Sequence, residues 1–417
     1  MLFVDSDLTD INDDDCAIYP RVLPLSYIST IRKSAHDLTL FALRLLSLPE
    51  REVRAIIPHG PIRDFLIDHL QVLRYRPHRL TGSFRFDMAI VGKPEKGNPP
   101  KLFELNEIGF GGLARSTHIE ETLFRLMPEL KKHLVALPAA SLELANMRRL
   151  GKSIVRIQAG TYDWEEEVLI QKAKSMGIDL RLVSPASYGF GEDLDAAPLL
   201  PELPTHMSGA RFVVGRKFQP DAVQFGFSFE LKDYLQDEKL YKNLVRSKTP
   251  LYGPFITGLV ASKMILVLLS DATLRRRLLG SARALEDVIL PAAPLPEKRE
   301  ALLKDTHSYV LKHVDGLGGE LVFMGNEIPP RLKRISKRDR EHWIIQQRTK
   351  MNVIKVNGIL SRPRRVISDL GVFVQYDWAQ GKFRHFGLGG FISRATNKSY
   401  RVNVSGGGIQ VPVMFAR

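Results

Sequence analysis

Two short strand-like segments each carry a pair of polar residues that are two positions apart. Arg85 and Asp87 belong to the first segment, and Glu104 and Asn106 belong to the second, beyond a turn at residues 95–100. Side chains two apart on a strand share a face, so a hairpin could bring the four together. Two carboxylates and an amide oxygen are hard ligands that suit Mg²⁺, which keeps other positions for waters and substrate phosphates. A solvated polar face of the hairpin is the alternative interpretation.

A second pattern combines a lysine with a glycine-rich turn. Lys312 lies in an apolar run and is followed by Gly316, Gly318 and Gly319 before a second apolar run. Backbone N–H groups and an ammonium group can cradle phosphates in such an arrangement. The segment is not a Walker loop, because no Gly-Lys-Ser/Thr sequence opens a helix. A plain hairpin turn that uses glycine for positive φ is the alternative.

Two further segments carry polar groups that could contact a nucleotide or an acyl phosphate. Gln346 and Gln347 end an apolar strand-like run whose backbone could read an adenine edge. Arg394 follows a glycine-rich stretch, and an arginine fork matches phosphate or acyl-phosphate oxygens. A solvated arginine on a strand is the alternative for Arg394.

Several other chemistries lack the residues that they need. The 11 histidines show no His-x-x-x-His spacing, and no Gly-x-Ser-x-Gly sequence occurs. The single cysteine, Cys16, lies in an acidic segment that disfavours a thiolate. One cysteine also cannot form an intrachain disulfide, which favours a reducing compartment. We therefore expect a cytoplasmic protein without zinc or thiolate catalysis.

Length and composition indicate a folded protein with an anionic partner. The 417 residues, 44% of them hydrophobic, predict two or three domains. The longest apolar stretch, residues 256–269, contains Lys263 and is too short to span a bilayer of roughly 30 Å. The acidic N-terminus is unlike a secretory signal. A net charge of +14 favours nucleic acid, an acidic membrane face, or phosphorylated or carboxylated small molecules.

The elements that must position these residues follow from hydrophobic periodicity. Apolar spacing of three and four residues predicts helices at 26–46, 61–73, within 117–150, and at 262–279. Alternation predicts the hairpin of 84–90 and 101–106. From residue 309 onward, strands and glycine-containing turns dominate.

Residues 152–235 follow the rhythm of a parallel sheet. Predicted strands at 154–158, 179–183 and 222–226 accompany a helix at 164–176. No Gly-x-Gly-x-x-Gly turn follows the first strand, so a dinucleotide site has little support. We expect a small Rossmann-like domain with a surface loop at 194–204.

Taken in order, these motifs resemble those of circularly permuted ATP-grasp ligases, most closely the glutathionylspermidine synthetase-like group. Members typically show Arg-x-Asp, then a strand with Glu-x-Asn, then a Rossmann-like segment, then nucleotide-binding lysines. The resemblance runs from about residue 80 to the end of the chain. It implies an α/β (α+β) ATP-grasp fold in permuted order. It further implies an N-terminal helical segment with the metal-site strands (1–150), a Rossmann-like pre-ATP-grasp domain (151–260) and nucleotide-binding subdomains (261–417).

The resemblance also implies roles for the residues that match. Mg²⁺ would be held by Asp87, Glu104 and Asn106. ATP would be bound by Lys263, Lys312, Gly316, Gly318, Gly319, Gln346 and Gln347. Arg85 and Arg394 would hold the acyl phosphate.

The implied function is an ATP-dependent carboxylate–amine ligase that forms an amide bond through an acyl phosphate and releases ADP and phosphate. Its substrates would be small-molecule or peptide carboxylates and amines, without a membrane partner. The turn after Asn106, Glu-Ile-Gly-Phe-Gly-Gly, differs from that of the polyamine-ligating members, so the substrates themselves are not implied.

Two alternatives belong to other classes. One is a nucleic-acid-binding protein that uses the basic runs 331–340 and 361–365, although solvated charge is the simpler interpretation because no aromatic residues interleave them. The other is an ATP-grasp scaffold without turnover.

Overall fold

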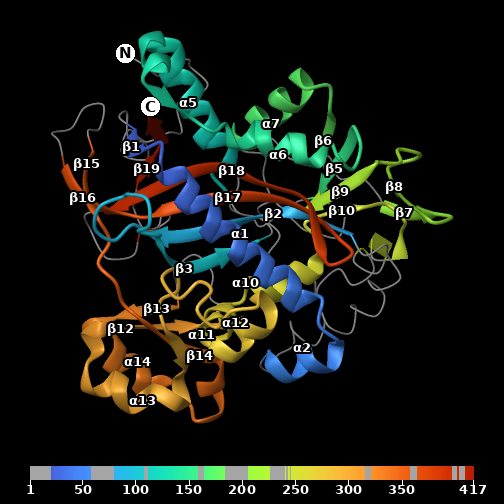
Figure 1. Cartoon of the computed structure of the whole chain (residues 1–417). Helices are drawn as coiled ribbons and strands as arrows, with labels where there is room; N and C mark the ends of the chain where they lie inside the picture. Colours follow the sequence, from blue (N-terminus) through green and yellow to red (C-terminus); the bar gives the residue numbers. More distant parts are fainter. Residues whose placement is uncertain are drawn as a thin grey trace.

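A large mixed sheet and a smaller antiparallel sheet form the framework of the fold (Figure 1). The computed structural model describes residues 20–57, 79–107, 111–157, 164–183, 205–225, 240, 243–244, 246–314, 321–356, 364–396, 402 and 409–417.

The large sheet contains 11 described strands in the order β15-β16-β18-β17-β2-β10-β9-β5-β6, with β3 paired to β2 and β19 paired to β18. These strands are β2 (Arg79–Ala89), β3 (Lys101–Asn106), β5 (Ser153–Ile157), β6 (Asp179–Val183), β9 (Ala222–Phe225), β10 (Leu251–Tyr252), β15 (Val353–Val356), β16 (Arg364–Ser368), β17 (Leu370–Ala379), β18 (Lys382–Thr396) and β19 (Ile409–Val411). Pairing is parallel from β2 through β10, β9 and β5 to β6, and antiparallel from β2 to β15. The predicted βαβ segment is therefore part of a parallel sheet, as expected.

Strand β2 lies where the pairing of the sheet changes from parallel to antiparallel. One edge of β2 is also shared by two different strands, which we call the fork of the sheet. Along one edge it pairs with β17 over almost its whole length. Along its other edge it pairs first with β10, at Thr81, and then with β3, from Arg85 to Ala89. Ligands in open α/β sheets favour positions where neighbouring strands part. The fork directs attention to the segment around Arg85.

The remaining strands form three smaller sheets. The four-stranded sheet has the order β11-β14-β12-β13, the three-stranded sheet β1-β20-β4, and the last joins β7 to β8. Their bounds are β1 (Arg21–Pro24), β4 (Leu134–Val135), β7 (Thr205–Ser208), β8 (Arg211–Val214), β11 (Ala292–Pro294), β12 (Tyr309–His313), β13 (Val322–Met324), β14 (Trp343–Gln347) and β20 (Val413–Ala416).

Helices cover both faces of the large sheet near β17 and β18. The α-helices are α1 (Tyr27–Leu46), α2 (Glu50–Ile56), α5 (Leu113–Leu126), α6 (Ala139–Met147), α7 (Trp164–Ser175), α10 (Gly258–Ala261), α11 (Met264–Ser270), α12 (Ala272–Leu279), α13 (Leu295–Lys304) and α14 (Ile328–Arg334). Short 3-10 helices are η1 (Pro128–Lys132), η2 (Phe255–Thr257), η3 (Thr306–Ser308), η4 (Gly325–Glu327) and η5 (Arg338–His342).

The alternation of β2 and β17 separates an apolar face from a polar one. Phe84 and Phe86 of β2 and Val372 and Val374 of β17 are fully buried in one core with α1. Phe373, which alternates with them, packs instead with residues of α5 and α6. Because side chains alternate along a strand, the odd-numbered residues of β2 share the face covered by α5 and α6. Arg85 and Asp87 lie on that face.

The structure corrects two of the predicted helices. The segment 262–279 forms two helices, α11 and α12, and the first ends at Ser270. The Asp271 carboxylate accepts hydrogen bonds from Thr273 N (2.7 Å) and Leu274 N (3.2 Å), which starts a new helix there. Within 117–150 the helices α5 and α6 are separated by η1 and β4, because Pro128 and Pro138 interrupt the helical hydrogen-bond ladder.

The three predicted domains, 1–150, 151–260 and 261–417, all contribute strands to the large sheet. Strands β2, β5 and β17 come from the three predicted domains and belong to one sheet. The predicted helix at 61–73 and the predicted loop at 194–204 lie outside the described residues.

Candidate functional site

The predicted hairpin forms and brings its four polar residues together. Strands β2 and β3 pair antiparallel, with Arg85 opposite Asn106 and Asp87 opposite Glu104. All four residues therefore lie at the fork of the large sheet. The expectation that they share a face is confirmed.

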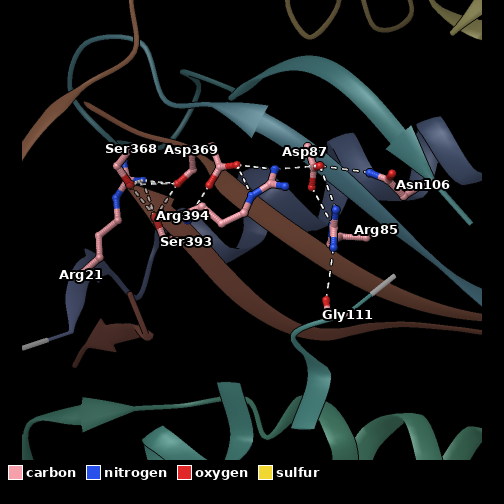
Figure 2. A network of polar contacts seen from close by, with 9 residues as sticks. All are labelled: Arg21, Arg85, Asp87, Asn106, Gly111, Ser368, Asp369, Ser393 and Arg394. Carbon is pink, nitrogen blue, oxygen red and sulfur yellow. Dashed lines mark hydrogen bonds and ion pairs between the residues drawn. The ribbon is translucent and has the colours of Figure 1, made fainter. Parts of the chain in front are cut away.

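Asp87 is the centre of this cluster (Figure 2). Its carboxylate is fully buried and accepts two hydrogen bonds from Arg85, from Nε to Oδ1 (2.8 Å) and from Nη2 to Oδ2 (3.1 Å). Oδ2 also accepts from Asn106 Nδ2 (3.0 Å) and lies 2.8 Å from Arg394 Nη2. Burial opposes ionisation, but the guanidinium groups of Arg394 and Arg85 outweigh it and lower the pKa of Asp87.

Arg394 has a second carboxylate partner that the sequence did not reveal. Asp369, in the link between β16 and β17, accepts from Arg394 Nε at its Oδ2 (2.8 Å) and from the Arg394 backbone N at its Oδ1 (2.6 Å). Its side chain is fully buried. A single aspartate in a strand link carries no spacing signal, which is why Asp369 escapes prediction.

A glycine of β17 lies opposite the centre of the cluster. Gly371 of β17 lies directly opposite Asp87, and a Cβ there would approach Ile392 Cγ2 to 2.7 Å and Arg85 Cδ to 3.4 Å. The contact that excludes a side chain here is the one with Ile392 of β18, whereas Arg85 lies at an ordinary van der Waals distance. Gly371 borders the site, and the sequence pattern did not reveal it.

Two lysines approach β3 from other parts of the chain. Lys263, at the start of α11, lies with its Nζ 3.1 Å from Glu104 Oε1. Lys312, on β12 of the small sheet, donates from Nζ to Phe103 O (2.8 Å) and to Gln346 Oε1 (2.7 Å). Both lysines are buried. The strand that carries Glu104 thus meets two ammonium groups.

The titration of this group reflects both burial and charge. Burial of Glu104 opposes its ionisation, but Lys263 and Lys312 more than compensate, so the pKa of Glu104 lies below its usual value. Burial lowers the pKa of Lys312 to about 8, although the Glu104 carboxylate acts in the opposite direction. Lys312 is therefore charged at neutral pH and begins to lose its proton in mildly alkaline solution.

The structure does not place Gln346 and Gln347 as their motif predicts. Gln346 is buried, and its side chain holds Lys312. Strand β14 pairs with β12 on one edge and with β11 on the other, so the backbone of Gln346 has no open edge for an adenine. Gln347 is exposed, and its N–H donates to Pro291 O (2.8 Å). The three loop glycines, Gly316, Gly318 and Gly319, lie outside the described residues.

The cluster offers carboxylate and amide oxygens, which are the kinds of ligand that Mg²⁺ prefers. Within the part of the chain that the structure describes, no group of three or more His, Cys, Asp or Glu side chains is arranged to hold a metal ion. Glu104 and Asn106 supply one carboxylate and one amide on the same face of β3, which fits a cation that keeps waters and phosphate oxygens as its other ligands. Asp87 differs, because both of its oxygens accept hydrogen bonds from arginine. This arrangement makes Asp87 the group that holds the two arginines.

The polar face of β2 continues away from the fork. Ser83 Oγ donates to Glu143 Oε1 of α6 (2.8 Å), and burial raises the pKa of Glu143 to about 7. At the far end, Arg79 binds Asp377 of β17 through Nε to Oδ1 (2.8 Å) and Nη2 to Oδ2 (3.0 Å). A row of polar residues thus follows one face of β2 along its length.

Comparison with known proteins identifies the fold. No protein-family profile and no curated protein matches the sequence. A solved structure does match: a glutathione synthetase-like effector (GSS30) from Globodera pallida, in its apo form, has a TM-score of 0.66 and 13% sequence identity. The match covers 95% of this chain and 89% of the other. The fold is glutathione synthetase-like.

At 13% identity this likeness concerns the fold alone. The predicted mixed α/β class is confirmed, while the permuted order and the glutathionylspermidine synthetase-like subgroup stay predictions. Among the described residues, no helix combines the length and the hydropathy needed to cross a membrane.

Proposed function

We propose that the protein is an ATP-dependent carboxylate–amine ligase of the ATP-grasp type, which releases ADP and phosphate. The observation that carries this proposal is the convergence of Lys263 and Lys312 on the strand that bears Glu104, beside the Arg85–Asp87–Arg394 cluster. These cations come from separate elements and meet at the fork of the sheet. A polyphosphate and a carboxylate substrate are the anions that such a site suits.

In this proposal a nucleotide lies between the two sheets. Lys263 and Lys312 offset the charge of its phosphates, and Gln346 keeps Lys312 in place through its side chain. Glu104 and Asn106 would hold Mg²⁺, while Asp87 holds Arg85 and Arg394. When bound, the ion would neutralise charge on the phosphates, which is a main requirement of phosphoryl transfer.

Arg85 and Arg394 act on the second substrate. A carboxylate oxygen attacks the γ-phosphorus, and the bond to ADP breaks. The amine nitrogen then attacks the acyl carbon, phosphate leaves with the electron pair of the broken C–O bond, and the proton that the amine loses goes to the departing phosphate. Charge accumulates on the transferring group, where two guanidinium forks fixed by Asp87 stabilise it.

The test is release of ADP in the presence of ATP and Mg²⁺, with a panel of carboxylates, each with and without a panel of amines. Amine-dependent release of ADP together with a new amide product supports the ligase. ATP binding without any turnover across the panel would favour a scaffold. Absence of ATP binding would refute the assignment of Lys263 and Lys312.

A further inference from the structure

A line of buried charges and hydroxyl groups reaches from the first described strand to the site. Figure 2 shows the line passing from Arg21 of β1 through Ser368, Ser393 and Asp369 to Arg394, and from there to Asp87. Arg21 and Ser368 are 347 positions apart in the chain. The proposed reaction uses only the end of the line that contains Arg394.

Arg394 is held from two sides. Asp369 accepts from its Nε (2.8 Å) and, at the other carboxylate oxygen, from its backbone N (2.6 Å), so the same carboxylate binds both the guanidinium group and the backbone of Arg394. Asp87 Oδ2 lies 2.8 Å from Nη2. A free arginine side chain samples many rotamers. Two buried carboxylates at fixed points leave the guanidinium one orientation.

Asp369 is itself held by Arg21. Arg21 Nη1 donates to the carbonyl oxygen of Asp369 (2.6 Å) and to the hydroxyl groups of Ser368 (3.0 Å) and Ser393 (3.3 Å). The backbone N of Asp369 donates to Arg394 O (3.0 Å), which ties the link between β16 and β17 to β18. Arg21 therefore fixes the backbone that carries the Asp369 carboxylate.

Burial of the Arg21 guanidinium carries a desolvation cost. It is 6% exposed, and burial lowers its pKa to about 10 despite the Asp369 carboxylate, so its charge is desolvated at neutral pH. Buried ion pairs often stabilise a protein no more than apolar residues of similar volume. Supporting groups that fix a functional side chain do improve a site, because small displacements of that side chain lower the rate strongly.

We propose that Asp369 and Arg21 are positioning residues that hold the guanidinium of Arg394 in the orientation in which it meets Asp87. The kinetic consequence of this inference rests on the proposed ligase function, whereas the orientation itself does not. Two measurements separate the orientation from the function.

The first measurement is hydrogen exchange at Arg394 Nε–H in the full chain labelled with ¹⁵N-arginine, assigned by loss of the signal in Arg394→Lys. Slow exchange is expected in the wild type, because a buried carboxylate accepts this hydrogen. Exchange should be at least about tenfold faster in Asp369→Asn and intermediate in Arg21→Lys, which keeps the charge but not the fork. Equal exchange in wild type and both variants would refute the positioning.

The second measurement is steady-state ADP release, with ATP affinity from calorimetry. Asp369→Asn should lower kcat by about 10- to 100-fold and leave the ATP dissociation constant within about threefold. The matched control is Asp377→Asn, which removes a two-pronged bond to Arg79 between β2 and β17 and should keep kcat. Equal losses in both variants, or a proportional loss of ATP affinity, would overturn the positioning role. If the wild type shows no turnover, the ligase proposal alone fails and the exchange experiment decides the positioning.

Discussion

Arg79 with Asp377 and Arg85 with Asp87 are two-pronged ion pairs on the same face of the β2–β17 strand pair. Their surroundings differ. Asp377 accepts from Arg79 and Thr81, and the Arg79 side chain is 32% exposed. Asp87 is fully buried and additionally meets Asn106 and Arg394.

The difference shows how identical chemistry serves two purposes. The outer pair joins neighbouring strands, and a half-exposed arginine keeps part of its hydration. The inner pair gathers an amide from β3 and charges from β2 and β18 in one buried place, where desolvation is expensive unless every charge has partners. Charged side chains are seldom buried, and where they are, the position is often a functional site. The inner end is therefore the end to test.

The largest effect is expected at Glu104, which lies opposite Asp87 of the inner pair. We expect Glu104→Gln to lower amine-dependent ADP release by about 100- to 1000-fold, the scale for removing one preorganised charged group. The amide keeps the shape but loses the charge that pairs with Lys263 and that a cation requires. Steady-state kinetics at saturating ATP measure the effect, with circular dichroism as the check of folding. A loss smaller than threefold would refute the metal role.

Arg85 is the next position. Arg85→Ala should lower kcat by about 10- to 100-fold with little change in ATP affinity, because it meets charge that develops during transfer. Arg85→Lys should retain part of the activity, since the charge stays while the two-pronged bond to Asp87 is lost. Kinetics and calorimetry on both variants measure this. If turnover and ATP binding fall in equal proportion, Arg85 serves the nucleotide instead.

Lys312 tests the part of the site contributed by the small sheet. Lys312→Ala should raise the dissociation constant for ATP by about 10- to 100-fold, or about 1.4–2.8 kcal/mol, which is the scale of one charge-assisted contact. Isothermal titration calorimetry measures it. Lys298→Ala is the matched control, because Lys298 is an exposed lysine on α13 beside the same sheet. Equal affinities in wild type and Lys312→Ala would return Lys312 to a purely structural role.

The same lysine predicts a pH dependence. Since the pKa of Lys312 is lowered to about 8, ATP affinity should fall about tenfold per pH unit above pH 8, where binding must restore the lost proton. The folded-state pKa lies below the unfolded value of about 10.4, so the stability cost of the buried charge is full below pH 8 and fades toward pH 10.4. Calorimetry between pH 7 and 9.5 measures the affinity. Lys312→Arg should remove the step, and its persistence there would assign it to another group.

The smallest effect on turnover belongs to the outer pair. Asp377→Asn should leave kcat within about twofold and lower the free energy of unfolding by about 1–3 kcal/mol, the scale of lost hydrogen bonds to a charged group. Urea unfolding and ADP release measure the two quantities. A large loss of turnover with unchanged stability would show that both ends of the strand pair serve the reaction.

Local patterns in the sequence were sufficient for the hairpin and for the first helix. The two-residue spacing of Arg85 with Asp87 and of Glu104 with Asn106 fixes their face, because alternation is a property of each strand. The helix expected at 26–46 is α1, whose buried residues recur every three or four positions. The parallel strands between 153 and 225 follow from the same kind of pattern.

The tertiary structure alone decided which charges meet. Lys312 reaches Phe103 across 209 positions, and Arg21 reaches Ser368 across 347. Residue spacing does not predict partners that are so far apart in the chain. Asp369 was therefore not predicted, and Gln346 was expected beside an adenine rather than beside Lys312. Periodicity determines the face of a strand on which a residue lies. The order of the strands and the need to pair every buried charge determine its neighbours.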